Sequence, residues 1–214
     1  MSGMQIGMVA TVAVALGVLL FARARERTDL ALLAKAVASA AFVALAVVRW
    51  RSGSAVDTWL VAALALGLAG DLLLQGRRTF DLGLAAFLLG HVAYVVAFSL
   101  ARPLVTWPAW PLFVLAAPAA VIGRWLWSRL GRRRVPVAVY IAAISAMVWG
   151  AVAAGSSGSV PPATILGAVL FYVSDVFVAR ERFVRPSFTN RLVGLPLYYA
   201  GQVLLALTVG VVRP

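Results

Sequence analysis

Long apolar runs, separated by short connections that carry charge, glycine or proline, form the main pattern along the chain. Each run is close in length to the roughly 20 residues that an α-helix needs to cross a bilayer. The pattern predicts an all-α, polytopic transmembrane bundle of eight helices that forms a single domain over residues 1–214. We expect the helices at about Met4–Ala22, Leu30–Val48, Ala55–Leu74, Leu82–Leu100, Trp110–Leu126, Val135–Ala154, Ala163–Ala179 and Leu192–Val212.

The composition indicates an integral membrane protein. Hydrophobic residues make up 63% of the chain and charged residues 12%, which lies outside the range of soluble globular domains. The formal net charge of +12 does not indicate a nucleic-acid partner, because the arginines lie in short connections between apolar runs. The absence of cysteine excludes disulfides and thiolate chemistry. No basic cluster precedes the first run, so we expect it to remain as a spanning helix rather than be cleaved as a signal peptide.

The arginines predict the orientation of the bundle. Most lie in the connections after the first, third, fifth and seventh runs: Arg23, Arg25, Arg27, Arg77, Arg78, Arg124, Arg129, Arg132, Arg133, Arg134, Arg180, Arg182, Arg185 and Arg191. The opposite side has Arg49, Arg51, Arg102 and Arg213. By the positive-inside rule the arginine-rich connections face the cytoplasm and both termini face outward. The abundance of alanine, valine and arginine is typical of a GC-rich bacterium, so we expect a multi-pass protein of the bacterial cytoplasmic (inner) membrane.

Two aspartates, Asp71 and Asp175, lie inside apolar runs near their cytoplasmic ends. A charged side chain at the centre of a bilayer costs about 2.5–3.5 kcal/mol on insertion scales, so acids placed there are usually functional. Further polar side chains are predicted in the same half of the bundle: Lys35, His91, Tyr94, Tyr172, Tyr198, Tyr199 and Gln202. The pattern therefore predicts a polar cavity that is reached from the cytoplasmic side.

Simpler interpretations exist for these residues. Lys35 and one aspartate would fasten helices together as a structural ion pair, although the second acid is then unaccounted for. His91 would be a packing residue, and the tyrosines would be interhelical contacts or interfacial anchors. Ser174 lies next to Asp175, but adjacent helical residues point to different faces and no nucleophile-elbow motif surrounds this serine. One histidine and no cysteine do not supply the ligands of a zinc hydrolase, so we expect neither a metal nor an organic cofactor.

Three short motifs occur in order on successive predicted helices. They are Gly70-Asp71-Leu72-Leu73-Leu74, Phe87-Leu88-Leu89-Gly90-His91-Val92-Ala93-Tyr94 and Tyr172-Val173-Ser174-Asp175. Together with Lys35 and the segment from Pro196 to Tyr199, they resemble the YhhN-like family, whose animal members include lysoplasmalogenases. The resemblance extends over essentially the whole chain. It implies a hydrolase that cleaves the vinyl ether bond of lysoplasmalogen-like lysophospholipids and releases a fatty aldehyde and a glycerophospho-base.

This chemistry suits two carboxyl groups in a pocket of low dielectric constant. Protonation of the outer alkene carbon of a vinyl ether creates an oxocarbenium ion, which water then attacks. One carboxylic acid supplies the proton, and a second carboxylate orients the water and stabilises the cation. We expect Asp71 and Asp175 to be this catalytic pair, with either residue as the acid. We expect the lysophospholipid substrate to contact Lys35, His91, Tyr94, Tyr172, Tyr198, Tyr199 and Gln202, in a protein surrounded by membrane lipids.

Two other classes of function remain open from the sequence. A small transporter or lipid-binding protein would use the same aspartates to bind a proton or a cation, and inverted repeats with helices broken at mid-membrane would favour transport. A packing or assembly protein without chemistry would make Asp71→Asn and Asp175→Asn mainly folding defects. A closed pocket with one lateral opening on the cytoplasmic side would favour the enzyme.

Overall fold

The computed structural model describes residues 1–76 and 78–211, which form eight α-helices and no strand. The helices are α1 Gly3–Ala24, α2 Thr28–Arg49, α3 Ala55–Leu73, α4 Phe80–Ala101, α5 Trp110–Trp127, α6 Arg134–Ser156, α7 Ala163–Ala179 and α8 Phe188–Thr208. Two 3₁₀ turns, η1 Leu104–Thr106 and η2 Gly131–Arg133, and one π turn, η3 Arg180–Val184, lie between them. The predicted all-α bundle is confirmed.

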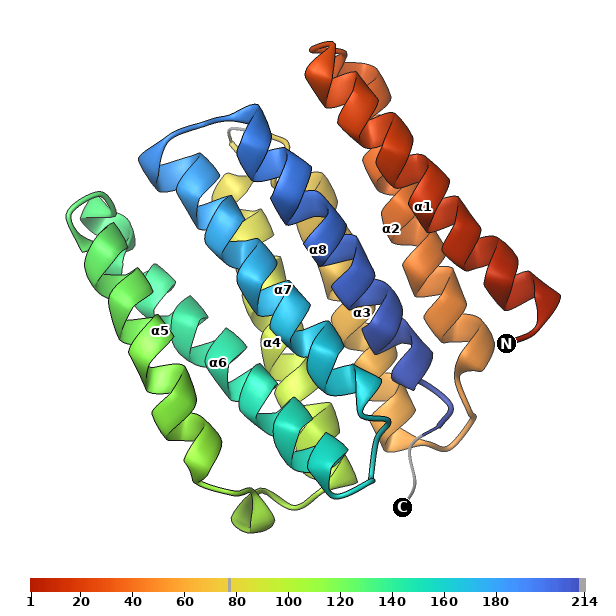
Figure 1. The fold of residues 1–214 in the computed structure, drawn as a ribbon. Coiled ribbons are helices and arrows are strands. Elements are labelled where there is room, and N and C mark those ends of the chain that lie inside the picture. Colours follow the sequence, from red (N-terminus) through yellow and green to blue (C-terminus); the bar gives the residue numbers. More distant parts are fainter. Residues whose placement is uncertain (77, 212–214) are drawn as a thin grey trace.

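The helices run up and down as one bundle (Figure 1), with α1 and α2 at one edge and α5 at the other. Contacts between neighbours in sequence are the most extensive for α1 with α2, α3 with α4, and α7 with α8. The α7–α8 pair packs closely because both helices have a glycine at the crossing. A Cβ atom on Gly201 would lie 2.8 Å from the carbonyl oxygen of Gly167, so a side chain there would force the helices apart.

The helix boundaries agree with the predicted ones to within two residues, except in α8. We predicted α8 over Leu192–Val212, and it spans Phe188–Thr208. It begins earlier because the Ser187 side chain caps it by accepting a hydrogen bond from the backbone N–H of Asn190. It ends earlier at a turn in which Gly210 has a φ of +78°. Val212 lies outside the described residues, as do Arg77 and Arg213.

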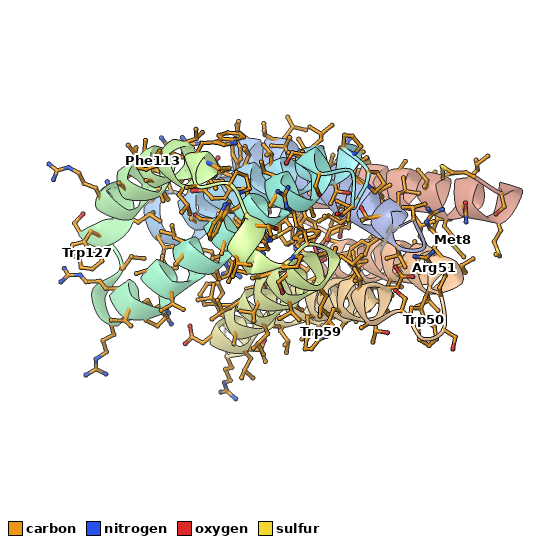
Figure 2. All side chains as sticks on the ribbon, turned by 90° about the horizontal axis from the view of Figure 1, so that it is seen from below. Met8, Trp50, Arg51, Trp59, Phe113 and Trp127 are labelled. Atoms are coloured by element: carbon orange, nitrogen blue, oxygen red, sulfur yellow. The ribbon has the colours of Figure 1, made fainter. Side chains whose placement is uncertain are left out.

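Seven helical stretches of the described chain are long and apolar enough to cross a membrane. The stretch outside that set is α8, whose polar residues include Asn190, Tyr198, Tyr199 and Gln202. These four side chains are buried in the bundle, so the polar face of α8 points inward. Apolar side chains cover the outside instead: Figure 2 shows Trp59 and Phe113 on the outer surface, and Phe113 is 79% exposed.

Arginines lie at both ends of the bundle. The connections that follow α1, α3, α5 and α7 lie together at one end (Figure 1), called here the arginine-rich end. At the opposite end, where α1 starts and α8 finishes, Arg49 donates to the carbonyl oxygens of Leu207 and Val209 at 2.9 and 3.0 Å. Arg102 donates to Ala153 O at 2.7 Å. Leu207 lies in the last turn of α8, whose carbonyl oxygens have no partner within the helix, whereas Ala153 O also accepts from the backbone N–H of Ser157.

Candidate active site

A cavity of about 410 Å³ lies toward the arginine-rich end of the bundle, and all eight helices contribute to its wall. Asp71 of α3 and Asp175 of α7 both line it, so two carboxylates that are distant in sequence face the same space. Most of the remaining wall is apolar: Leu19, Leu84, Phe87, Ile122, Leu126, Val137, Ile141, Ile144, Val176 and Phe177. A cavity of this kind suits a ligand with an apolar chain and a few polar groups.

Asp71 is held by three donors from two other helices. Its Oδ1 lies 2.8 Å from the Nζ of Lys35 on α2, and its Oδ2 accepts hydrogen bonds from Ser39 at 2.6 Å and Tyr198 at 2.8 Å. The side chain of Asp71 is 2% exposed and that of Lys35 is 10% exposed. The ion pair is therefore largely shielded from solvent, and the carboxylate has one fixed orientation.

A chain of hydrogen bonds continues from Asp71 into the bundle. Gln202 donates from Nε2 to the Tyr198 hydroxyl at 3.1 Å, and its Oε1 accepts from Tyr94 at 3.0 Å. Because the Tyr198 oxygen accepts from Gln202, its own proton is directed to Asp71. Tyr199 lies beside the same carboxylate, with its hydroxyl 3.3 Å from that of Ser39. This network fixes the position of Tyr198 and, through it, that of Asp71.

Asp175 has a different and sparser environment. Its Oδ2 accepts a hydrogen bond of 2.6 Å from Tyr140 on α6 and lies 3.4 Å from the Nε2 of His91 on α4. His91 also lies 3.1 Å from the Tyr140 hydroxyl and contacts Met147 sulfur through Nδ1 at 3.3 Å. No described residue hydrogen-bonds to Asp175 Oδ1, and the side chain is 15% exposed. Asp175 therefore keeps one carboxyl oxygen for a ligand.

The predicted site residues fall into two groups. Asp71, Asp175, Lys35, Tyr172 and Tyr198 line the cavity. The other four, His91, Tyr94, Tyr199 and Gln202, are buried behind the wall, where they hydrogen-bond or pair with wall residues or with one another.

Ser174, which lies next to Asp175 in the sequence, has no part in this wall. It is fully buried and donates to the carbonyl oxygen of Phe171 at 2.7 Å. Its hydroxyl is thus used within its own helix and does not face the cavity. Within the described residues, no three histidine or acidic side chains gather in a way that would hold a metal ion.

Sequence reasoning did not single out Ser39 or Tyr140. Ser39 lies four residues after Lys35, so both point to the same face of α2, and that spacing was a usable signal. Tyr140 is one of five tyrosines in the chain, and all five lie in the cavity wall or directly behind it. Each tyrosine inside an apolar run was therefore a candidate site residue.

Three arginines that the sequence assigned to membrane orientation also line the cavity: Arg23, Arg182 and Arg191. The sequence did not identify these arginines as cavity residues, because the positive-inside rule alone accounts for an excess of arginine at this end. Only the fold shows which of these arginines turn inward.

The chain is similar to known membrane proteins. A model of the YhhN family matches residues 30–209. Lysoplasmalogenase TMEM86B of Sus scrofa is 34% identical over 158 residues, which cover 74% of this chain and 66% of that protein. Lysoplasmalogenase of Mycobacterium bovis is 36% identical over 159 residues, which cover 69% of this chain and 58% of that protein.

A third relative is the uncharacterized membrane protein YhhN of Escherichia coli O157:H7, which is 28% identical over 155 residues, or 71% of this chain and 74% of that protein. The chain thus spans less than two thirds of the length of the two lysoplasmalogenases. No solved structure gives a significant match.

Proposed function

The chain belongs to the YhhN family, and we propose that it is a membrane-embedded hydrolase that cleaves the vinyl ether bond of lysoplasmalogen-like lysophospholipids. The products are a fatty aldehyde and a glycerophospho-base. The names of the relatives support this reaction. The observation that carries the proposal is that Asp71 and Asp175 line one largely apolar cavity inside a membrane bundle.

The surroundings of the two aspartates favour different roles. Asp71 is fixed by a lysine ammonium and two hydroxyl groups. We assign to it the part of the permanent anion, which stabilises the positive charge that develops on the substrate. Asp175 keeps Oδ1 for the substrate and is held on its other oxygen by Tyr140. We assign to Asp175 the part of the acid that protonates the outer alkene carbon.

The remaining steps follow from this assignment. Protonation of the alkene carbon moves the π electrons and leaves an oxocarbenium ion beside the Asp71 carboxylate. Water adds to the cationic carbon and gives its proton to the Asp175 carboxylate, which the first step deprotonated. The resulting hemiacetal then transfers its hydroxyl proton to the ether oxygen, the C–O bond breaks, and aldehyde and glycerol hydroxyl separate. The acid and the anion are both regenerated.

The other predicted residues act through these two. Lys35 and Tyr198 hold Asp71, while His91 lies beside Asp175 and Tyr140. We propose that Tyr172, whose side chain lines the cavity, contacts the substrate directly.

We further propose that the protein lies in a bacterial cytoplasmic membrane with the arginine-rich end, and hence the cavity, on the cytoplasmic side. The chain has no native cysteine, so single cysteines placed at Arg129 and Ser159 report the two sides separately. A membrane-impermeant thiol reagent added to intact cells should label the position at Ser159 and spare that at Arg129. The reverse labelling would overturn the orientation.

Aldehyde release from an alkenyl lysophospholipid tests the proposed activity. Purified wild-type protein in detergent should release aldehyde, and Asp71→Asn and Asp175→Asn should each abolish release while keeping the wild-type circular dichroism and elution volume. Asp81→Asn is the matched control, because Asp81 is 68% exposed in its ion pair with Arg133 and does not line the cavity. Folded wild-type protein that releases no aldehyde from either choline or ethanolamine forms would refute the assignment for these substrates.

Inverted repeats with helices broken at mid-membrane would favour the transporter alternative. In the described chain each of the eight helices is continuous between its ends. An uptake assay in proteoliposomes distinguishes the two functions. A transporter should take up its substrate in response to a gradient of protons or cations, whereas a hydrolase should cleave the lipid without such a gradient.

A further inference from the structure

Three arginines surround the end of the cavity nearest the helix connections, and they are called here the mouth arginines: Arg23, Arg182 and Arg191. They come from the last turn of α1, the π turn η3 and the first turn of α8. Arg23 and Arg191 are partly buried, whereas Arg182 is exposed. All three line the same cavity, although they come from three separate elements.

The mouth carries an excess of positive charge. The carboxylate that lines the cavity beside these three arginines is that of Glu181. Arg191 binds Glu181 Oε1 through Nε and Nη2, at 3.0 and 2.7 Å. Glu181 is also held by Asn190 at 2.9 Å. One carboxylate therefore balances one arginine, and two guanidinium charges remain without an acidic partner among the described residues.

The unbalanced guanidinium groups keep donors for a ligand. Arg23 donates from Nη2 to the Gln75 side chain, and Arg182 donates from Nη2 to the carbonyl oxygen of Leu74. Arg182 also stacks on Phe80, with its Cζ 4.6 Å from the ring centroid. A guanidinium group has five N–H donors, so these contacts orient each group and leave other donors toward the opening. Oriented arginines with spare donors are suited to the oxygens of a phosphate.

The apolar wall lies deeper in the same cavity, and Asp71 and Asp175 lie along that wall. Arginines at one end of the cavity and an apolar wall deeper inside match a single-chain lipid with an anionic phosphate at one end. We infer that the mouth arginines form a subsite for the phosphodiester of the lipid headgroup, with Arg23 and Arg182 as its main donors. The inference rests on the proposed function, because it adds a headgroup site to the same cavity.

Binding of lipids that cannot be cleaved tests the subsite without catalysis. One ligand is a saturated alkyl ether lysophosphatidylethanolamine, and the other is the matching alkylglycerol, which lacks the phosphate. Dissociation constants are measured by microscale thermophoresis in nanodiscs for wild type, Arg23→Gln and Arg182→Gln. Arg25→Gln is the matched control, because Arg25 lies only two residues after Arg23 but is exposed and does not line the cavity.

Wild type should bind the phospholipid at least about tenfold more tightly than the alkylglycerol, since charge-assisted hydrogen bonds contribute that much or more. Arg23→Gln and Arg182→Gln should each weaken phospholipid binding about tenfold and leave alkylglycerol binding unchanged. Arg25→Gln should change neither. Equal loss of both ligands, or no loss of the phospholipid, would overturn the subsite.

Competition with inorganic phosphate shows whether the mouth arginines bind the phosphodiester of a lipid headgroup or free phosphate. A lipid headgroup site should release the phospholipid only at phosphate concentrations far above those of the lipid, because inorganic phosphate has no chain to bury. Displacement at equal concentrations would make this a free-phosphate site and overturn the inference. If wild type releases aldehyde and Arg182→Gln has the same KM as wild type, the headgroup subsite is refuted and the proposed hydrolase activity stands. If phospholipid binding depends on the arginines but wild type releases no aldehyde, the hydrolase activity is refuted and the subsite stands.

Discussion

Substitution of Lys35 by methionine removes the cation of a buried ion pair while keeping most of the side-chain volume. Loss of one partner of such a pair costs about 3–5 kcal/mol, because the other charge stays buried and uncompensated. The Asp71 side chain is 2% exposed, so the carboxylate left without its cation stays largely shielded from solvent. It retains the hydroxyl groups of Ser39 and Tyr198 as donors. We therefore expect a loss near the lower limit, about 3 kcal/mol.

Addition of Asp71→Asn on the Lys35→Met background removes the orphaned charge, and the new side-chain amide still accepts a hydrogen bond from Tyr198. We expect the double variant to recover about 2 kcal/mol of the loss. Unfolding free energies of wild type, both single variants and the double variant, measured in micelles by steric trapping, give the coupling energy. The double variant should also be folded and inactive. Additive losses, with the double variant the least stable of the four, would refute the account of the pair.

Three further substitutions test other parts of the site and its scaffold. Tyr140→Phe should lower kcat about tenfold to a hundredfold with little change in KM, because it removes the hydrogen bond that positions Asp175; initial rates at saturating and limiting substrate separate the two parameters. Tyr94→Phe should cost about 1–3 kcal/mol of stability, because it leaves a buried amide oxygen of α8 without its donor; denaturant titration measures this. Gly201→Ala should destabilise by about 1–3 kcal/mol through overpacking and lower the melting temperature, whereas Gly17→Ala, with nothing within 4 Å, should not.

The bundle was predictable because the membrane imposes a length and a composition on each helix. The eight helices and most of their ends follow from apolar runs and from the residues that interrupt them. The shared position of the two aspartates followed from depth, since each lies near the same end of its helix. The ion pair of Lys35 with Asp71 was predicted only as one of two possibilities, because the sequence did not show whether Asp71 or Asp175 lies beside Lys35.

Other features depend on which helices meet, and depth alone does not determine that. Tyr140 approaches Asp175 because α6 packs beside α7, and His91 joins them because α4 packs on α6. The rotation of each helix about its axis also decides whether an end arginine faces water or the cavity. Arg23 faces inward and Arg25 does not, although they are two residues apart.

Because the π turn η3 carries Arg182, the length of the α7–α8 connection determines whether this side chain faces the cavity. Its i to i+5 hydrogen bond, from Arg185 N to Arg180 O at 2.9 Å, takes in one residue more than an α-helical turn. Deletion of one residue would rotate the preceding or following side chains by about 100° and turn Arg182 away from the cavity. The α6–α7 connection has no such constraint, since a side chain on Gly158 would meet nothing within 4 Å, although its φ of +81° favours glycine. Tags and reporter domains for this bundle therefore belong beside Ser157 and Ser159, and the α7–α8 connection should be left at its natural length.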